Sequence, residues 1–174
     1  PSLPPGLDGR AVIARELAAY ADRDYTLATT EAGLLPLLSG WTAVDTWGLN
    51  DATIAHSETG ITTEYLSERA PEVVLVHGAW SPVFDDPRVG ATLGPEWDAM
   101  TDLLRQWCVE SGYTLAAAWG ASHADTFQFW VAPDFPDRDA IITIIREARF
   151  EFMGGPGIFV DFADVSGRLE PADR

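Results

Sequence analysis

Val73-Val-Leu-Val-His77 is the stretch that decides the fold, and it follows directly after Pro71 and Glu72. Four aliphatic residues in a row, three of them β-branched, favour an extended strand over a helix. A continuous apolar run without polar alternation is typical of a strand that is covered on both faces. The stretch therefore predicts a buried strand in an α/β layer.

Two further strands are expected upstream, over residues 25–30 and 42–46, and helical segments separate the three strands. Connections of that length require crossovers, which favour parallel pairing in a right-handed α/β arrangement. The first helix has Asp8 as its expected cap and apolar residues at helical spacing through Tyr20. The other upstream helices are expected over 32–38, from residue 50 or 51 to 56, and over 62–69.

Downstream of a long loop at 81–95, the pattern predicts a helix, a hairpin and a second helix. The expected elements are a helix over 96–110 closed by Gly112, strands over 113–119 and 126–131, a helix from an Asp137 cap to Ala148, and an edge strand over 158–162. The sequence thus predicts an α/β fold with three layers, in which helices flank a mostly parallel sheet that ends in an antiparallel hairpin. We expect a linker at 1–7, a single domain at 8–165 and a flexible tail at 166–174.

The composition excludes several classes of partner. The 174 residues carry a formal charge of −16, and all 11 basic residues are arginine. Such a negative field repels nucleic-acid phosphates and anionic headgroups, so we expect no nucleic-acid partner. The chain has no apolar run long enough to span a bilayer, and Pro1 suggests a processed or cut start. Cys108, the one cysteine, falls on the apolar face of a helix and is expected to be a buried, inert thiol.

Known catalytic patterns remain incomplete in this chain. His77-Gly78 after a strand is similar to the oxyanion loop of α/β-hydrolases, but Ser122 lacks a nucleophile elbow and has only His123 after it. His77-Gly78 is then a strand end followed by a glycine turn. The three histidines have no metal-ligand spacing and no phosphate loop follows a strand, so we expect no metal, no cofactor and no catalytic residue.

The carboxylates of the first half are expected to gather at one edge of the sheet. Glu31 follows the first strand, and Asp45 and Asp51 follow or end the second. The carboxyl ends of parallel strands are where α/β folds place ligand sites. The alternative is structural, because Asp51 can cap a helix and Asp45 can bind loop N–H groups.

The seven tryptophans divide into two groups. Those on the core face of the long helix or within strands are expected to be buried, and they are Trp97, Trp107, Trp119 and Trp130. Those at strand edges or in loops would matter more if exposed, because indole faces stack on sugar rings, and they are Trp41, Trp47 and Trp80.

The segment 30–56 resembles part of a known family. Its sequence is Thr30-Glu-Ala-Gly-Leu-Leu-Pro-Leu-Leu-Ser-Gly-Trp-Thr-Ala-Val-Asp-Thr-Trp-Gly-Leu-Asn-Asp-Ala-Thr-Ile-Ala-His56. This string is similar to the segment after the last transmembrane helix of polytopic glycosyltransferases of the arabinofuranosyl- and mannosyltransferase type. The matching positions are Gly33, Pro36, Ser39, Gly40, Asp45, Gly48, Leu49, Asn50, Asp51, Ile54 and Ala55, and the likeness covers about residues 10–60.

The resemblance implies an extracytoplasmic domain that lies over a membrane-embedded transferase using a lipid-linked sugar. Its expected partners are its own transmembrane region, which is absent from these 174 residues, and a glycan acceptor. The acidic residue that activates the acceptor would lie in a loop between transmembrane helices, so this domain would not be catalytic alone. The residues expected to bind the acceptor are Glu31, Asp45, Trp47, Asn50, Asp51 and His56.

Two other functions stay open from the sequence. An independent soluble enzyme could use Glu31 and Asp45 as acid and base at the sheet edge. A protein-interaction module could dock through Trp41 and Trp47.

Overall fold

A computed structural model describes residues 9–78, 94–122, 125–152, 155–156 and 158–159. Several predictions lie outside these residues: the linker at 1–7, the Asp8 cap, most of the loop at 81–95, Trp80 and the tail at 166–174. The helices are α1 (Gly9–Leu17), α2 (Leu34–Ser39), α3 (Ala52–Ala55), α4 (Thr63–Arg69), α5 (Pro95–Glu110) and α6 (Arg138–Glu147), with a 3-10 helix η1 (Ala18–Arg23) after α1. The strands are β1 (Thr26–Thr29), β2 (Thr42–Asp45), β3 (Val73–Gly78), β4 (Thr114–Ser122), β5 (Asp125–Val131), β6 (Glu151–Phe152), β7 (Gly155–Pro156) and β8 (Ile158–Phe159).

One mixed sheet organises the molecule, with the strand order β2-β1-β3-β5-β4-β8. The pairs β1–β2 and β1–β3 are parallel, as the crossover connections predict. From β3 onward the pairing is antiparallel, and β4 and β5 form the predicted hairpin. Strands β6 and β7 make a separate small ribbon. Parallel pairing is therefore confined to the first three strands of the chain.

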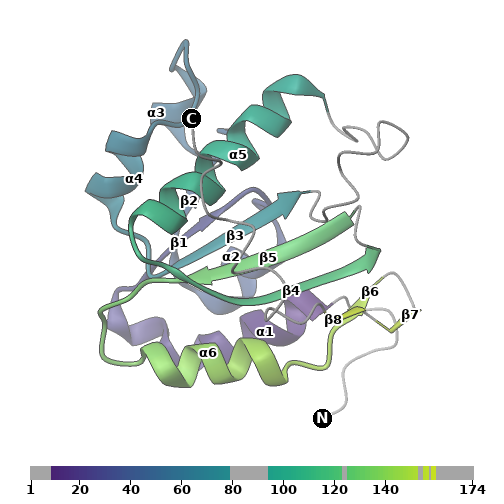
Figure 1. Cartoon of the computed structure of the whole chain (residues 1–174). Helices are drawn as coiled ribbons and strands as arrows, with labels where there is room; N and C mark the ends of the chain where they lie inside the picture. Colours follow the sequence, from purple (N-terminus) through teal and green to yellow (C-terminus); the bar gives the residue numbers. More distant parts are fainter. Residues whose placement is uncertain (1–8, 79–93, 123–124, 153–154, 157, 160–174) are drawn as a thin grey trace.

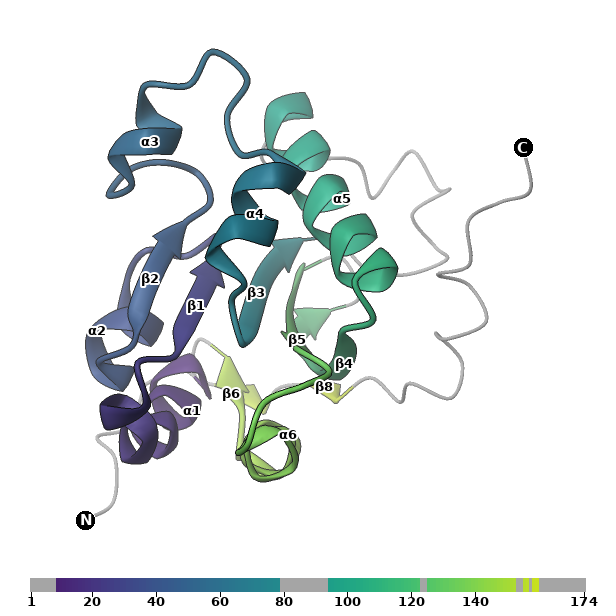
Figure 2. The same ribbon diagram turned by 90° about the vertical axis from the view of Figure 1, so that its left-hand side faces the viewer.

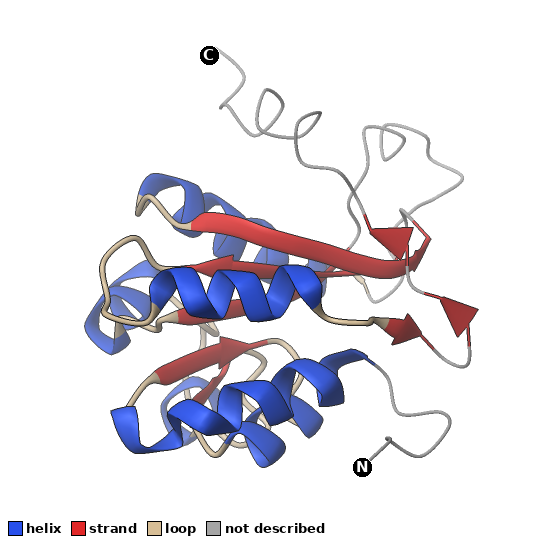
Figure 3. Ribbon diagram, turned by 90° about the horizontal axis from the view of Figure 1, so that it is seen from below, coloured by secondary structure: helices blue, strands red, loops and turns tan. Residues whose placement is uncertain are grey.

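Helices cover both faces of the sheet, which gives the three predicted layers (Figures 1 and 2). One face packs against α1, α2 and α6 through a cluster that includes Leu17, Leu35 and Ile145. Figure 3 views the molecule from the side of this layer. The other face packs against α3, α4 and α5 through Ile54, Leu66 and Leu104, among others. Successive residues of a strand point to opposite faces of the sheet, so their buried apolar side chains belong alternately to the two clusters.

Strand β3 confirms the first prediction, because residues 73–76 are all fully buried. Val73 and Leu75 belong to one cluster, whereas Val74 and Val76 belong to the other. Cys108 is also fully buried, and burial raises the pKa of its thiol. Both observations follow from sheet faces that are covered by helices.

One predicted cap is wrong. Asp137 lies at the start of α6, but its side chain makes no capping hydrogen bond there. Its carboxylate instead accepts a hydrogen bond from the Tyr25 hydroxyl at 2.7 Å and lies 3.4 Å from Arg23 Nε. A partner that is distant in the sequence has displaced the local capping role.

The first described residue, Gly9, lies in contact with Phe150, which follows α6. Gly9, the first residue of α1, lies so close to Phe150 that a Cβ atom there would fall 2.2 Å from the ring. The Phe150 ring is stacked on Trp119, with centroids 5.5 Å apart. Within the residues that the structure describes, every helix is too short or too polar to cross a membrane.

Candidate functional site

The loop that follows β2 is shaped by the buried carboxylate of Asp45. One oxygen, Oδ1, accepts hydrogen bonds from the backbone N–H groups of Trp47 and Gly48, both at 3.2 Å. The other, Oδ2, accepts from Asn50 N at 2.7 Å. The residue is only 3% exposed, so almost none of its side chain meets solvent. Asp45 therefore holds the loop in one conformation.

Gly48 is required by the same loop. It has φ of +87°, in the left-handed region that favours glycine. A Cβ atom at this position would lie 3.0 Å from Ala55 N and from Ile54. The loop thus packs directly on the last two residues of α3.

Asp51 joins the two short helices that follow. Its Oδ1 accepts from Thr53 N at 3.0 Å and Ile54 N at 3.2 Å, which confirms the expected helix cap. Its Oδ2 accepts from the Tyr65 hydroxyl on α4 at 2.9 Å. Burial, followed by this hydrogen bond, raises the pKa of Tyr65. Asp51 consequently ties α3 to α4.

Glu31 lies at the end of β1 between two basic side chains. Its Oε1 is 2.5 Å from Nδ1 of His77, at the end of β3, and its Oε2 accepts from Arg10 at 2.8 Å. Burial by itself raises the pKa of the Glu31 carboxyl. The hydrogen bond and charge of His77, together with Arg10, outweigh that effect and hold the pKa below its usual range.

The sequence predicted His77 only as the end of a strand, and the structure shows that its side chain contacts Glu31. Its ring stacks on Phe127 with centroids 4.2 Å apart, and the Arg10 guanidinium lies 4.3 Å from the same Phe127 ring. Its backbone N–H donates to Thr30 Oγ1 at 2.8 Å, and its carbonyl accepts from Trp97 Nε1 at 3.0 Å. Parallel pairing of the two strands was predicted, and it places residues 31 and 77 at the same edge.

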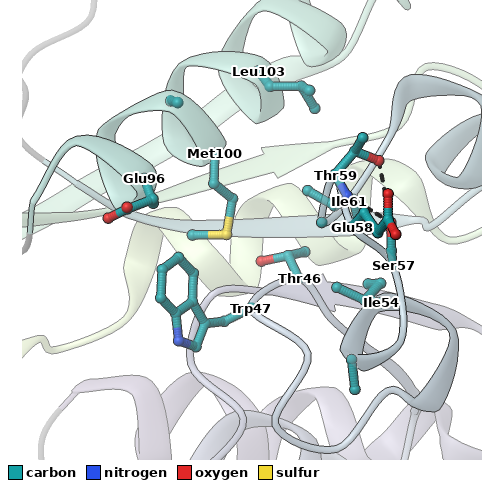
Figure 4. A pocket seen from close by; sticks show the side chains of 13 residues that line it. Thr46, Trp47, Ile54, Ser57, Glu58, Thr59, Ile61, Glu96, Met100 and Leu103 are labelled. Carbon is teal, nitrogen blue, oxygen red and sulfur yellow. Dashed lines mark hydrogen bonds between the residues drawn. The ribbon is translucent and has the colours of Figure 1, made fainter.

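A pocket of about 500 Å³ opens between the loop after β2, residues 57–61 and α5 (Figure 4). This volume falls within the range of small-molecule sites. Trp47 forms part of its wall and is 42% exposed. Trp47 also packs on Trp97, with ring centroids 5.1 Å apart. Apolar side chains from α3 and α5 line the interior, and hydroxyl and carboxylate groups line the rim.

The six predicted binding residues are only partly brought together. Trp47 lines the pocket, whereas the other five do not. Asn50 and His56 are exposed, and His56 Nδ1 is 2.6 Å from the carbonyl of Ala52. Glu31 and Asp45 have separate partners, so the structure gives them no direct contact as an acid and base pair.

Trp41 corrects a further expectation. It is 5% exposed, and its indole N–H donates to the carbonyl of Leu17 at 3.0 Å. An interaction surface through Trp41 and Trp47 together is therefore wrong, because only Trp47 reaches solvent. Among the described residues, no group of three or more His, Cys, Asp or Glu side chains could hold a metal ion.

Comparison with known proteins places the chain at the level of family. Neither the curated proteins nor the solved structures contain a match to it. A family model described as a domain of unknown function, DUF8728, matches residues 7–132. Because this match covers most of the chain, the protein belongs to the DUF8728 family.

Proposed function

We propose that this chain is the extracytoplasmic domain of a membrane glycosyltransferase, and that it binds the glycan acceptor without catalysing transfer. The resemblance of residues 30–56 to the segment after the last transmembrane helix of such enzymes supports the proposal. In this reading the transmembrane region of the same protein carries the chemistry. The domain then lies next to the membrane and presents its pocket to the acceptor.

The observation that carries this proposal is the exposed indole of Trp47 at the mouth of a pocket. Sugar rings present an apolar C–H face and a rim of hydroxyl groups, and an indole face suits the former. The Trp47 backbone is fixed by Asp45 and its ring packs on Trp97, so little conformational entropy is lost on binding. Hydroxyl and carboxylate groups on the pocket rim offer partners for the sugar hydroxyls.

Binding of glycans to the purified chain tests the proposal directly. A glycan array followed by titration calorimetry should identify oligosaccharides that bind without being turned over. Trp47→Ala should weaken that binding by at least about tenfold, because a rigid aromatic platform is lost. Leu37→Ala, at a residue 77% exposed on α2, is the matched control and should leave affinity unchanged. Absence of glycan binding would contradict the proposal.

The location can be tested in the intact protein by thiol labelling. Cys108 is the one cysteine of these 174 residues and is fully buried, and the protein without an added cysteine measures the background labelling. Leu49, 76% exposed beside the pocket loop, can be replaced by cysteine to give an accessible thiol. A membrane-impermeant maleimide should label Leu49→Cys in intact cells. Labelling only after lysis would place the domain on the cytoplasmic side and contradict the proposal.

The pair formed by Glu31 and His77 favours one second candidate, an independent enzyme. A carboxylate 2.5 Å from an imidazole nitrogen at the carboxyl edge of a sheet is the arrangement that orients a general base. If this candidate is right, the purified chain turns over a glycan that it binds. His77→Gln should then abolish this turnover and leave glycan binding unchanged. Turnover would favour the enzyme, and binding without turnover would favour the acceptor-binding domain.

A further inference from the structure

The charge of the pocket lining bears on which ligands it accepts. Two glutamates, Glu58 and Glu96, line the pocket, and among the described residues that line it there is no arginine or histidine. The formal charge of the whole chain, these two glutamates included, is −16. We infer that the pocket binds a saccharide that carries no anionic group, and that it rejects uronic acids and phosphorylated sugars. This inference rests on the proposed glycan binding and names its substrate class.

The interior of the pocket suits the C–H face of a sugar ring. Ile54 and Ile61 are each 5% exposed, and Met100 is 7% exposed, so the floor is apolar and packed. Leu103 continues this surface along α5, and Trp47 stands beside it (Figure 4). An anionic substituent placed against this floor would lose hydration, and the described lining offers it no cationic partner.

The polar rim of the pocket consists mainly of hydrogen-bond acceptors, so it favours a ligand with hydrogen-bond donors. Glu58 and Glu96 are exposed, and an ionised carboxylate can only accept hydrogen bonds. Ser57 and Thr59 share a hydroxyl–hydroxyl bond at 3.1 Å, and Ser57 Oγ also accepts from Thr59 N. Sugar hydroxyls donate as well as accept, whereas a carboxylate or phosphate only accepts at neutral pH. The rim therefore complements a neutral sugar and opposes an anionic one.

The inference is tested with matched pairs of neutral sugars and their uronic acids. Methyl glycosides of the gluco, galacto and manno series, each with its uronic acid, are titrated against the full chain at low salt. The uronic acid of any pair that binds should be at least about fivefold weaker, the effect of one unit-charge contact in water. The difference in affinity between the neutral sugar and its uronic acid should decrease when the salt concentration is raised from about 20 mM to about 500 mM, because screening weakens the repulsion.

Charge-neutral variants identify the source of the discrimination. Glu58→Gln combined with Glu96→Gln should reduce the difference between neutral and uronic sugars to about twofold or less. Glu16→Gln combined with Glu147→Gln changes the total charge equally at exposed positions on α1 and α6, in the other helical layer. This control pair should leave the discrimination intact.

The possible outcomes separate this inference from the function on which it rests. Equal or tighter binding of uronic acids, still lost in Trp47→Ala, would overturn the charge selectivity and leave glycan binding standing. Discrimination that persists in the Glu58 and Glu96 double variant would also overturn it. Failure of every sugar to bind would overturn both proposals. Weaker uronic acid binding that is restored by salt and by the double variant would support the inference.

Discussion

Asp45 accepts hydrogen bonds from three backbone N–H groups while it is almost fully buried. Asp45→Ala leaves those groups without their charged acceptor. We expect it to lower the free energy of unfolding by about 2–4 kcal/mol, measured by urea denaturation with tryptophan fluorescence. Asn50→Ala keeps the backbone N–H and removes only an exposed amide, so it should cost less than about 0.5 kcal/mol. Equal effects would show that the loop keeps its shape without Asp45.

Glu31 should make stability depend on pH. Its folded-state pKa is lowered, so its contribution is present above the unfolded pKa and is lost as pH falls through the folded pKa. Glu31→Gln should cost about 1–2 kcal/mol at neutral pH, as expected for charge-assisted hydrogen bonds. The difference from wild type should begin to shrink near pH 4.5, the usual value, and keep falling below it. Unfolding curves across this range measure it.

A matched variant distinguishes the effect of breaking the Glu31 ion pairs from the effect of removing one negative charge. Glu147→Gln removes an exposed carboxylate on α6. If its acid dependence matches that of Glu31→Gln, the effect belongs to net charge and the contacts with Arg10 and His77 contribute little.

The chain order of strands and polar residues predicted part of the site. It placed Glu31, Asp45 and Asp51 near one sheet edge, and it recognised that Asp51 caps a helix. It could not show which carboxylate faces solvent, because that depends on three loop N–H groups converging on Asp45. It interpreted His77 only as a strand end, because the contact with Glu31 depends on the register that pairs Thr29 with Leu75, which is a tertiary property.

At the scale of helices and strands, the pattern of apolar residues predicted the type of element correctly where that pattern was long or continuous. The run at 73–76 and the apolar face of α5 predicted a strand and a helix that the structure confirms. The Asp137 cap failed for a nonlocal reason. Its partner Tyr25 is 112 residues away, and a capping preference describes only neighbouring residues.

The bond from Tyr25 to Asp137 should contribute to the docking of α6. Tyr25 is 8% exposed, and burial, followed by this hydrogen bond, raises its pKa. Tyr25→Phe removes the hydroxyl and should lower the free energy of unfolding by about 1 kcal/mol. Tyr20→Phe, at a partly buried tyrosine near the same helices, is the control and should have no comparable effect in urea denaturation. Two equal losses would contradict a specific role for the Asp137 contact.

Strand β5 carries a polar side chain that the core does not satisfy. Gln128 is fully buried, and within the described structure its Oε1 has no hydrogen-bond partner. Its Nε2 has a long contact of 3.5 Å with Thr126 Oγ1. Gln128→Leu should raise the free energy of unfolding by about 1–2 kcal/mol, because an incompletely satisfied amide is replaced by an apolar side chain.

Thr126, two residues before Gln128 on β5, has a satisfied hydroxyl and provides the opposite case. Thr126 Oγ1 donates to the carbonyl of Gly78 at 2.7 Å, so Thr126→Val should destabilise the chain. Thermal unfolding of both variants measures the contrast. A destabilised Gln128→Leu would indicate that the amide is satisfied by bound water.

At the scale of the whole molecule, the charge of −16 predicts a response to salt. Self-repulsion destabilises a compact state, and salt screens it. Raising NaCl from about 0.05 M to about 0.5 M should increase the free energy of unfolding by about 1 kcal/mol or more. A variant with Glu16→Gln, Asp22→Asn and Glu147→Gln, all at exposed positions, should gain less. An equal gain would point to exclusion of salt from the surface.

The contact between Gly9 and Phe150 has a consequence for how the protein is made. A ribosome emits α1 near the beginning of this segment and Phe150 close to its end, at about 5–20 residues per second. Until α6 and that ring emerge, α1 can pack on α2 but lacks its remaining contacts. Helix α1 is thus synthesised before the other described helices but completes its packing only after residue 150 has emerged, and over that interval its uncovered part is a binding surface for chaperones.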